Sequence, residues 1–120
     1  MQTYDAYIAV MKTPAYLGEF EYAVLLAVLQ LRDAAYAVPI RELIEGRTTR
    51  AVARGALYTA LERLETKGCL TSEMSDPLPE RGGRSRRYYH VSAAGLASLR
   101  ATRAALLALW KGVESQIERP

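Results

Sequence analysis

The stretch GALYTALERLETKG, residues 55–68, carries the clearest pattern in the chain. Leu57, Leu61 and Leu64 recur at spacings of four and then three residues, which is the apolar stripe of a helix that packs on a core. We predict a helix over residues 51–67, and Gly68 stands where a glycine commonly ends a helix. The pattern therefore predicts a half-buried helix whose other face is turned to solvent.

The outward face of this helix suits a nucleic-acid surface. It presents Gly55, Tyr58, Thr59, Glu62 and Arg63, with Arg54 at its flank. Because a glycine has no side chain, the backbone there can approach a groove closely, while the hydroxyl groups and arginines can bond to phosphates or bases. The alternative is an ordinary solvated helix face, and this helix alone does not decide between the two.

The segment that follows predicts a small β-hairpin with a basic connection. We expect strands over residues 69–74 and 84–91, joined by the Pro- and Gly-rich loop 76–83. The arginines of this region are grouped around Gly82 and Gly83, and they are Arg81, Arg84, Arg86 and Arg87. Strand alternation places Arg84 and Arg86 on one face with Tyr88. Such a cluster repels itself and is stabilised by an anion such as phosphate, whereas the alternative is a hairpin whose charges only guard an edge against aggregation.

Upstream of residue 51, the pattern completes a helix-turn-helix. An apolar stripe predicts a helix over residues 18–32, and Pro39 suits the first turn of a short helix that ends near Gly46. The order helix, short helix, longer helix, strand, basic loop, strand is that of a winged helix-turn-helix. A further helical stripe over residues 4–12 precedes it. We therefore expect a mainly α-helical chain with a small β-hairpin.

The end of the chain predicts one long helix that begins after Ser92, a good helix cap. Its apolar seam follows the alternation of a heptad repeat, and it consists of Leu96, Leu99, Leu106, Trp110, Val113 and Ile117. A helix of roughly 25 residues is about 37 Å long, which is more than so small a domain can cover. The simplest partner is the same helix of a second chain. We divide the chain into an N-terminal helix, 1–14, a winged helix-turn-helix domain, 15–91, and a dimerisation helix, 92–120.

The composition argues against several classes of protein. The 120 residues suffice for one domain, and the net charge of +3 permits binding to nucleic acid without requiring it. The single cysteine, Cys69, and the single histidine, His90, cannot form a disulfide or a zinc site, and there is no Gly-rich phosphate loop. We expect no metal, no cofactor and no catalysis. Because the sequence has neither a long apolar run nor a secretory signal pattern, we also expect a cytoplasmic protein with no membrane partner.

Three segments occur in a characteristic order. They read LGEFEYAVLL at residues 17–26, GALYTALERLETKG at residues 55–68 and ERGGRSRRYY at residues 80–89. Together they resemble the PadR family of transcription regulators, over about residues 17–100. The short chain is similar to the subgroup that has a single C-terminal helix.

The resemblance implies a homodimer that represses transcription by binding a roughly palindromic operator in double-stranded DNA. The residues expected to contact DNA are Arg54, Gly55, Tyr58, Thr59, Arg63, Arg81, Gly82, Gly83, Arg84 and Arg86. The C-terminal helix is expected to dimerise, often with help from the N-terminal helix. In some relatives a small apolar or aromatic effector enters between the subunits. Trp110 is the natural residue to line such a space here, or it is only a large aromatic in the dimer contact.

Two other hypotheses about the function also fit the sequence. The main alternative is a winged-helix protein-interaction module, whose basic hairpin contacts an acidic protein without sequence-specific DNA binding. A DNA-binding dimer that responds to no effector also fits the sequence. The steep salt dependence of phosphate contacts separates DNA binding from protein binding in part, and sequence selectivity separates the two fully.

Overall fold

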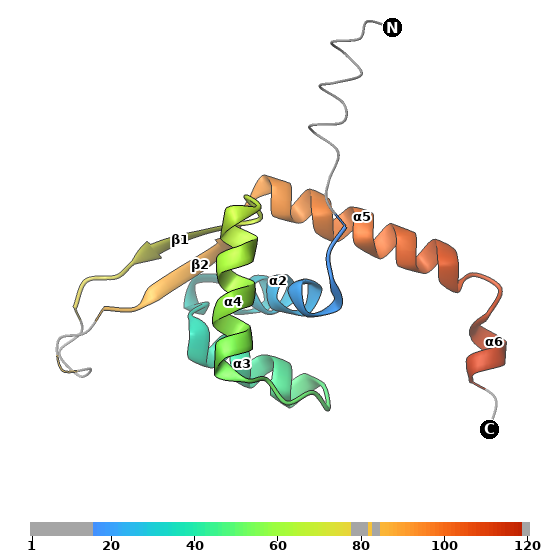
Figure 1. The fold of residues 1–120 in the computed structure, drawn as a ribbon, viewed down its shortest axis with the longest axis horizontal. Coiled ribbons are helices and arrows are strands. Elements are labelled where there is room, and N and C mark those ends of the chain that lie inside the picture. Colours follow the sequence, from blue (N-terminus) through green and yellow to red (C-terminus); the bar gives the residue numbers. More distant parts are fainter. Residues whose placement is uncertain (1–15, 78–81, 83–84, 119–120) are drawn as a thin grey trace, which may run out of the picture.

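The computed structural model describes residues 16–77, 82 and 85–118, so the helix expected over residues 4–12 lies outside the described residues. The elements are α2 (Glu19–Leu31), the short 3-10 turn η1 (Arg32–Ala34), α3 (Ala37–Arg47), α4 (Arg54–Thr66), β1 (Leu70–Met74), β2 (Arg87–Val91), α5 (Ala93–Trp110) and α6 (Glu114–Ile117) (Figure 1). The two strands form one antiparallel hairpin. This confirms the predicted mainly helical winged helix-turn-helix.

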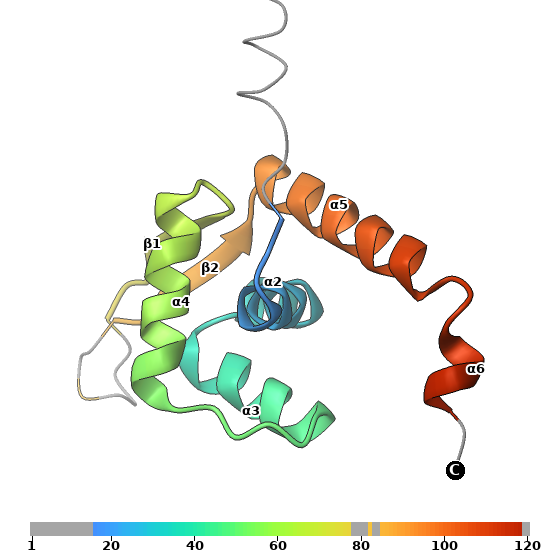
Figure 2. The same cartoon turned by 45° about the vertical axis from the view of Figure 1, so that its right-hand side comes forward.

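Helix α2 lies at the centre of the domain. Figure 2 shows it nearly end-on, with α3, α4, the hairpin and α5 arranged around it. The core consists of buried apolar side chains from each of these elements, chiefly Val24, Leu25, Ile40, Ile44, Leu57, Leu61, Leu64, Tyr89 and Leu99. The three leucines of α4 are therefore buried as the sequence predicts, and the opposite face of α4 is left exposed.

Helix α4 begins at Arg54, three residues later than the prediction of 51–67. The reason is that the preceding residues are held in an extended conformation by the core. Val52 is buried, and its backbone N–H donates to Glu45 Oε2 at 2.9 Å, which fixes the turn between α3 and α4. At the other end, α4 stops at Thr66, and Gly68 has a φ of 80°, the left-handed conformation that favours a cap glycine.

The hairpin is shorter than predicted on its second strand, because β2 begins at Arg87 rather than at residue 84. The ladder runs from Leu70 opposite Val91 to Met74 opposite Arg87. The backbone N–H of Tyr89 donates to the carbonyl oxygen of Ala35 at 2.8 Å. Since Ala35 lies just before α3, this bond fixes the hairpin against the helix-turn-helix.

Helix α5 is capped as predicted, because the Ser92 hydroxyl oxygen accepts from the backbone N–H of Gly95. The predicted helix of about 25 residues is nevertheless wrong. Helix α5 has 18 residues and ends at Trp110, where Gly112, with a φ of 91°, turns the chain before α6. Val113 and Ile117 therefore do not continue the seam of α5 on one straight helix.

Candidate nucleic-acid interface

The outward face of α4 carries the side chains that the sequence assigned to DNA. Arg54, Gly55, Tyr58, Thr59 and Arg63 are all exposed, and Tyr58 is 49% exposed. A Cβ atom built on Gly55 would meet nothing within 4 Å. Packing within the described chain therefore does not require a glycine at this position, although a glycine disfavours a helix relative to alanine.

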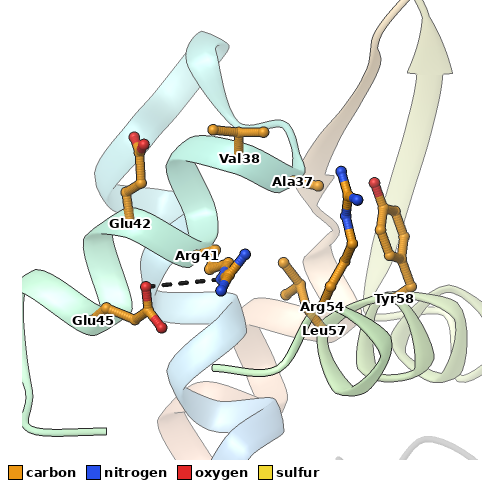
Figure 3. A pocket seen from close by; sticks show the side chains of 8 residues that line it. All are labelled: Ala37, Val38, Arg41, Glu42, Glu45, Arg54, Leu57 and Tyr58. Carbon is orange, nitrogen blue, oxygen red and sulfur yellow. Dashed lines mark ion pairs between the residues drawn. The ribbon is translucent and has the colours of Figure 1, made fainter. Parts of the chain in front are cut away.

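A cleft of about 210 Å³ lies between α3 and the first turns of α4 (Figure 3). Arg54 and Tyr58 extend side by side along its α4 wall, toward Ala37 (Figure 3). On the α3 wall, Arg41 forms an ion pair with Glu45 at 3.8 Å, so its charge is partly neutralised. Arg54 of α4, unlike Arg41 of α3, also lines a second hollow beside the hairpin.

The loop end of the strand ladder adds two more arginines beside this wall. A smaller cleft of about 170 Å³ lies between the hairpin and the two helices, and its lining residues are Tyr36, Ala37, Val38, Arg54, Tyr58, Ser85, Arg86, Arg87 and Tyr89. We call this hollow the wing-side cleft. Three of these residues are arginines and none is acidic. Such a hollow concentrates positive potential and attracts a phosphate group.

Aromatic contacts hold the wing-side cleft in shape. The guanidinium of Arg86 lies over the ring of Tyr36 at 4.2 Å, and Tyr88 meets the same ring edge-on with centroids 5.6 Å apart. The side chains of Arg86 and Tyr88 thus lie on the same side of the hairpin, although Arg86 precedes β2. The guanidinium of Arg87 donates to the Ser72 hydroxyl at 2.9 Å. The arginines are therefore positioned by the fold rather than carried on a free loop.

The starts of α3 and α4 reinforce this charge. Neither helix has an acidic residue in its first turn, and neither N-cap residue, Tyr36 or Ala53, caps its helix with a side-chain hydrogen bond. The first backbone N–H groups of a helix point outward and carry partial positive charge. Both helix starts line the wing-side cleft through Ala37 and Arg54.

The remaining predicted contacts divide into two groups. Gly82 is exposed and has a φ of 66°, whereas Arg81, Gly83 and Arg84 lie outside the described residues.

The sequence alone did not identify Tyr36 or the start of α3 as part of the site, because their contacts with the hairpin join distant parts of the chain. The sequence signal was weak: an aromatic residue, Tyr36, stands just before the short helix that Pro39 indicates.

The far end of the chain carries a separate, apolar surface. Leu106, Leu109, Trp110, Val113 and Ile117 line a shallow hollow of about 180 Å³ at the corner between α5 and α6. Leu96 and Leu107 are also exposed, whereas Leu99 is only 7% exposed and packs in the chain's own core. The burial of Leu99 thus needs no second chain.

Among the described residues, no helix is both long and apolar enough to cross a lipid bilayer.

Comparisons with known proteins agree on one family. The model of the transcriptional regulator PadR-like family matches residues 25–101. A PadR family transcriptional regulator from Eggerthella lenta has a similar structure, with 28% identity, a TM-score of 0.65, and coverage of 98% of this chain and 97% of that chain. A PadR-like transcription factor from Bacteroides fragilis is 25% identical over 92% of this chain and 97% of its own, with a TM-score of 0.67.

A PadR family regulator from Clostridium difficile shares the fold, with a TM-score of 0.67 and 22% identity over 82% of this chain and 98% of that chain. No curated protein sequence matches the chain.

Proposed function

Because the chain belongs to the PadR-like family of transcriptional regulators, which bind DNA and are not enzymes, we propose that it is a sequence-specific repressor. It binds a roughly palindromic operator as a homodimer and acts in the cytoplasm, where it occupies a promoter and excludes the transcription machinery. Its outward α4 face enters the major groove, and its hairpin contacts the adjacent backbone.

The observation that carries this proposal is the wing-side cleft. It brings Arg54 and Tyr58 of α4 together with Arg86 and Arg87 of the hairpin, in a hollow whose lining, among the described residues, includes no acidic side chain. Arginine guanidinium groups match phosphate oxygens in pairs, so this cleft can fix the register of α4 on a duplex. Thr59 and Arg63 then face the groove from the same helix. Gly82 lies in the connection between the two strands, and its neighbours in the sequence, Arg81, Gly83 and Arg84, are proposed as further backbone contacts.

The apolar corner between α5 and α6 supports the proposed homodimer. Leu109 is 76% exposed and Ile117 is 63% exposed, which is unusual for large apolar side chains that share one surface. We assign the dimer contact to Leu96, Leu106, Trp110, Val113 and Ile117, and we leave Leu99 out because the single chain already buries it. A second copy is the occupant we propose, and it would present two α4 helices to successive turns of the duplex.

A small apolar or aromatic effector is proposed for the same corner. Trp110 lines the hollow there and is 41% exposed, so a flat apolar molecule can stack on its ring between two subunits. Such a ligand releases the operator only if it binds better to a dimer whose α4 helices are wrongly spaced.

The test is selection of duplexes from a random DNA library by the purified protein at physiological salt. We expect enrichment of an inverted repeat with half-sites about one helical turn apart. Retention of all duplexes without enrichment would indicate an architectural DNA binder. No retention at all would favour the protein-interaction module and contradict the proposal.

A further inference from the structure

A second groove runs along the other edge of the outward face of α4. It has a volume of about 700 Å³ and lies between the start of α2 and α4. Arg54 and Tyr58 line the wing-side cleft, whereas Gly55, Thr59, Arg63 and Lys67 line this groove. The two hollows therefore flank the surface that is proposed to enter the major groove. We call the second one the α2-side groove.

The α2-side groove holds two cations and one carboxylate among its lining residues. The Lys67 ammonium donates to both oxygens of Glu21, at 2.9 and 2.8 Å, and Arg63 lines the same groove. The Lys67 side chain is 42% exposed, whereas that of Glu21 is only 15% exposed. The positive groups therefore face outward, with the carboxylate beneath them, and one positive charge is left in excess.

A second ion pair lies beside it, but here the carboxylate is the more exposed partner, since the side chain of Glu19 is 85% exposed and that of Arg50 is 40% exposed. Arg50, in the turn before α4, forms an ion pair with Glu19, and its guanidinium lies over the ring of Phe20 at 4.7 Å. Phe20 itself lines the α2-side groove. The first turn of α2 thus supplies two carboxylates, and each is paired with a cation from the α4 side of the molecule.

The carboxylates have a structural reason to be there. Acidic side chains stabilise the start of a helix, and Glu21 also accepts the backbone N–H of Gly18 at 3.2 Å, which caps α2. The same position sets a negative charge under the cations of the groove. Stability of α2 and attraction of an anion to the groove are therefore in conflict at Glu21.

We propose that the α2-side groove receives the second DNA backbone that borders the major groove, with Arg63 and Lys67 as phosphate contacts, and that Glu21 lowers DNA affinity by partly neutralising Lys67. This inference rests on the proposed function. A helix in the major groove has a sugar–phosphate backbone on each side of it, because the groove is only about 12 Å wide. The wing-side cleft serves one backbone and the α2-side groove serves the other.

The first test is Glu21→Gln, which removes the charge and keeps an oxygen acceptor. We expect affinity for duplex DNA to rise about threefold, equally for the selected operator and for a scrambled duplex, because phosphate contacts carry no sequence information. The matched control is Glu118→Gln, which removes the same charge from an exposed position after α6 and should leave affinity unchanged. Thermal melting of each variant reports whether the fold is retained.

The second test does not depend on Glu21. Lys67→Met should weaken binding several-fold and reduce the slope of log affinity against log salt by about 0.9, the value for one lost phosphate contact. Lys67→Arg keeps the charge and should restore both. If Glu21→Gln, Lys67→Met and the wild-type protein bind alike, this inference is overturned while the proposed function stands. If the wild-type protein binds no DNA, the proposed function fails first and the inference falls with it.

Discussion

At the residue scale, Gly55 is the position where stability and function are expected to oppose each other. It lies in the first turn of α4, and beyond the adjoining backbone of that helix an added methyl group meets no atom within 4 Å. We expect Gly55→Ala to raise the free energy of unfolding by about 0.5 kcal/mol, because alanine loses less backbone entropy in a helix. The same methyl group should weaken operator binding by keeping α4 out of the groove. Denaturant unfolding and a DNA titration measure the two effects, and unchanged affinity would show that the glycine has no role in approach.

Glu21 gives a prediction about pH at the same scale. Burial raises the pKa of its carboxyl, but the hydrogen bonds from Lys67 and Gly18 and the charges of Lys67 and Arg63 outweigh it, so the pKa lies below the ordinary value of a glutamate. A lowered folded pKa means that the carboxylate stabilises the fold above the unfolded pKa and that this contribution is lost as pH falls through the folded value. Between about pH 5 and pH 3, the wild-type protein should therefore lose more unfolding free energy than Glu21→Gln. Urea denaturation measures this free energy, and equal losses for the two proteins would show that Glu21 does not contribute to the pH dependence.

At the element scale, the sequence predicted which segments are helices better than where they end. The leucine spacing of α4 was sufficient to place its buried face, because that signal is local and periodic. The start of α4 was predicted too early because it depends on Val52 in the core and on Glu45 from α3. Gly112 was a visible signal for the end of α5, but the continuing apolar pattern through Val113 and Ile117 concealed it.

The apolar corner between α5 and α6 gives the element-scale prediction. Leu106→Glu places a charge on a surface that we propose is buried between two copies, and burying an unpaired charge there is costly. We expect this variant to be a folded monomer by analytical ultracentrifugation, since Leu106 is 44% exposed in the single chain.

Thr71→Glu, on the exposed edge of β1, is the control and should remain a dimer. A stable Leu106→Glu dimer would mean that the dimer contact lies elsewhere on the chain.

At the scale of the whole molecule, the proposed DNA surface and the proposed dimer surface lie on different sides. Figure 1 shows α4 and the hairpin toward one end of the domain and α6 at the other. The order of elements was enough to predict that α4 turns one face outward, since that is the recognition helix of a winged helix-turn-helix. The sequence could not show that Tyr36 holds Arg86 beside Arg54, because that contact depends on tertiary packing of the hairpin on α3.

The central claim is that the arginines of the wing-side cleft bind the DNA backbone. The most direct measurement compares the salt dependence of operator affinity for the wild-type protein, Arg54→Ala and Arg100→Ala, an exposed arginine on α5 that serves as the matched charge control. We predict that Arg54→Ala binds about tenfold more weakly, with a slope smaller by about 0.9, and that Arg100→Ala behaves as wild type. Equal affinity and slope for Arg54→Ala and the wild-type protein would contradict the account.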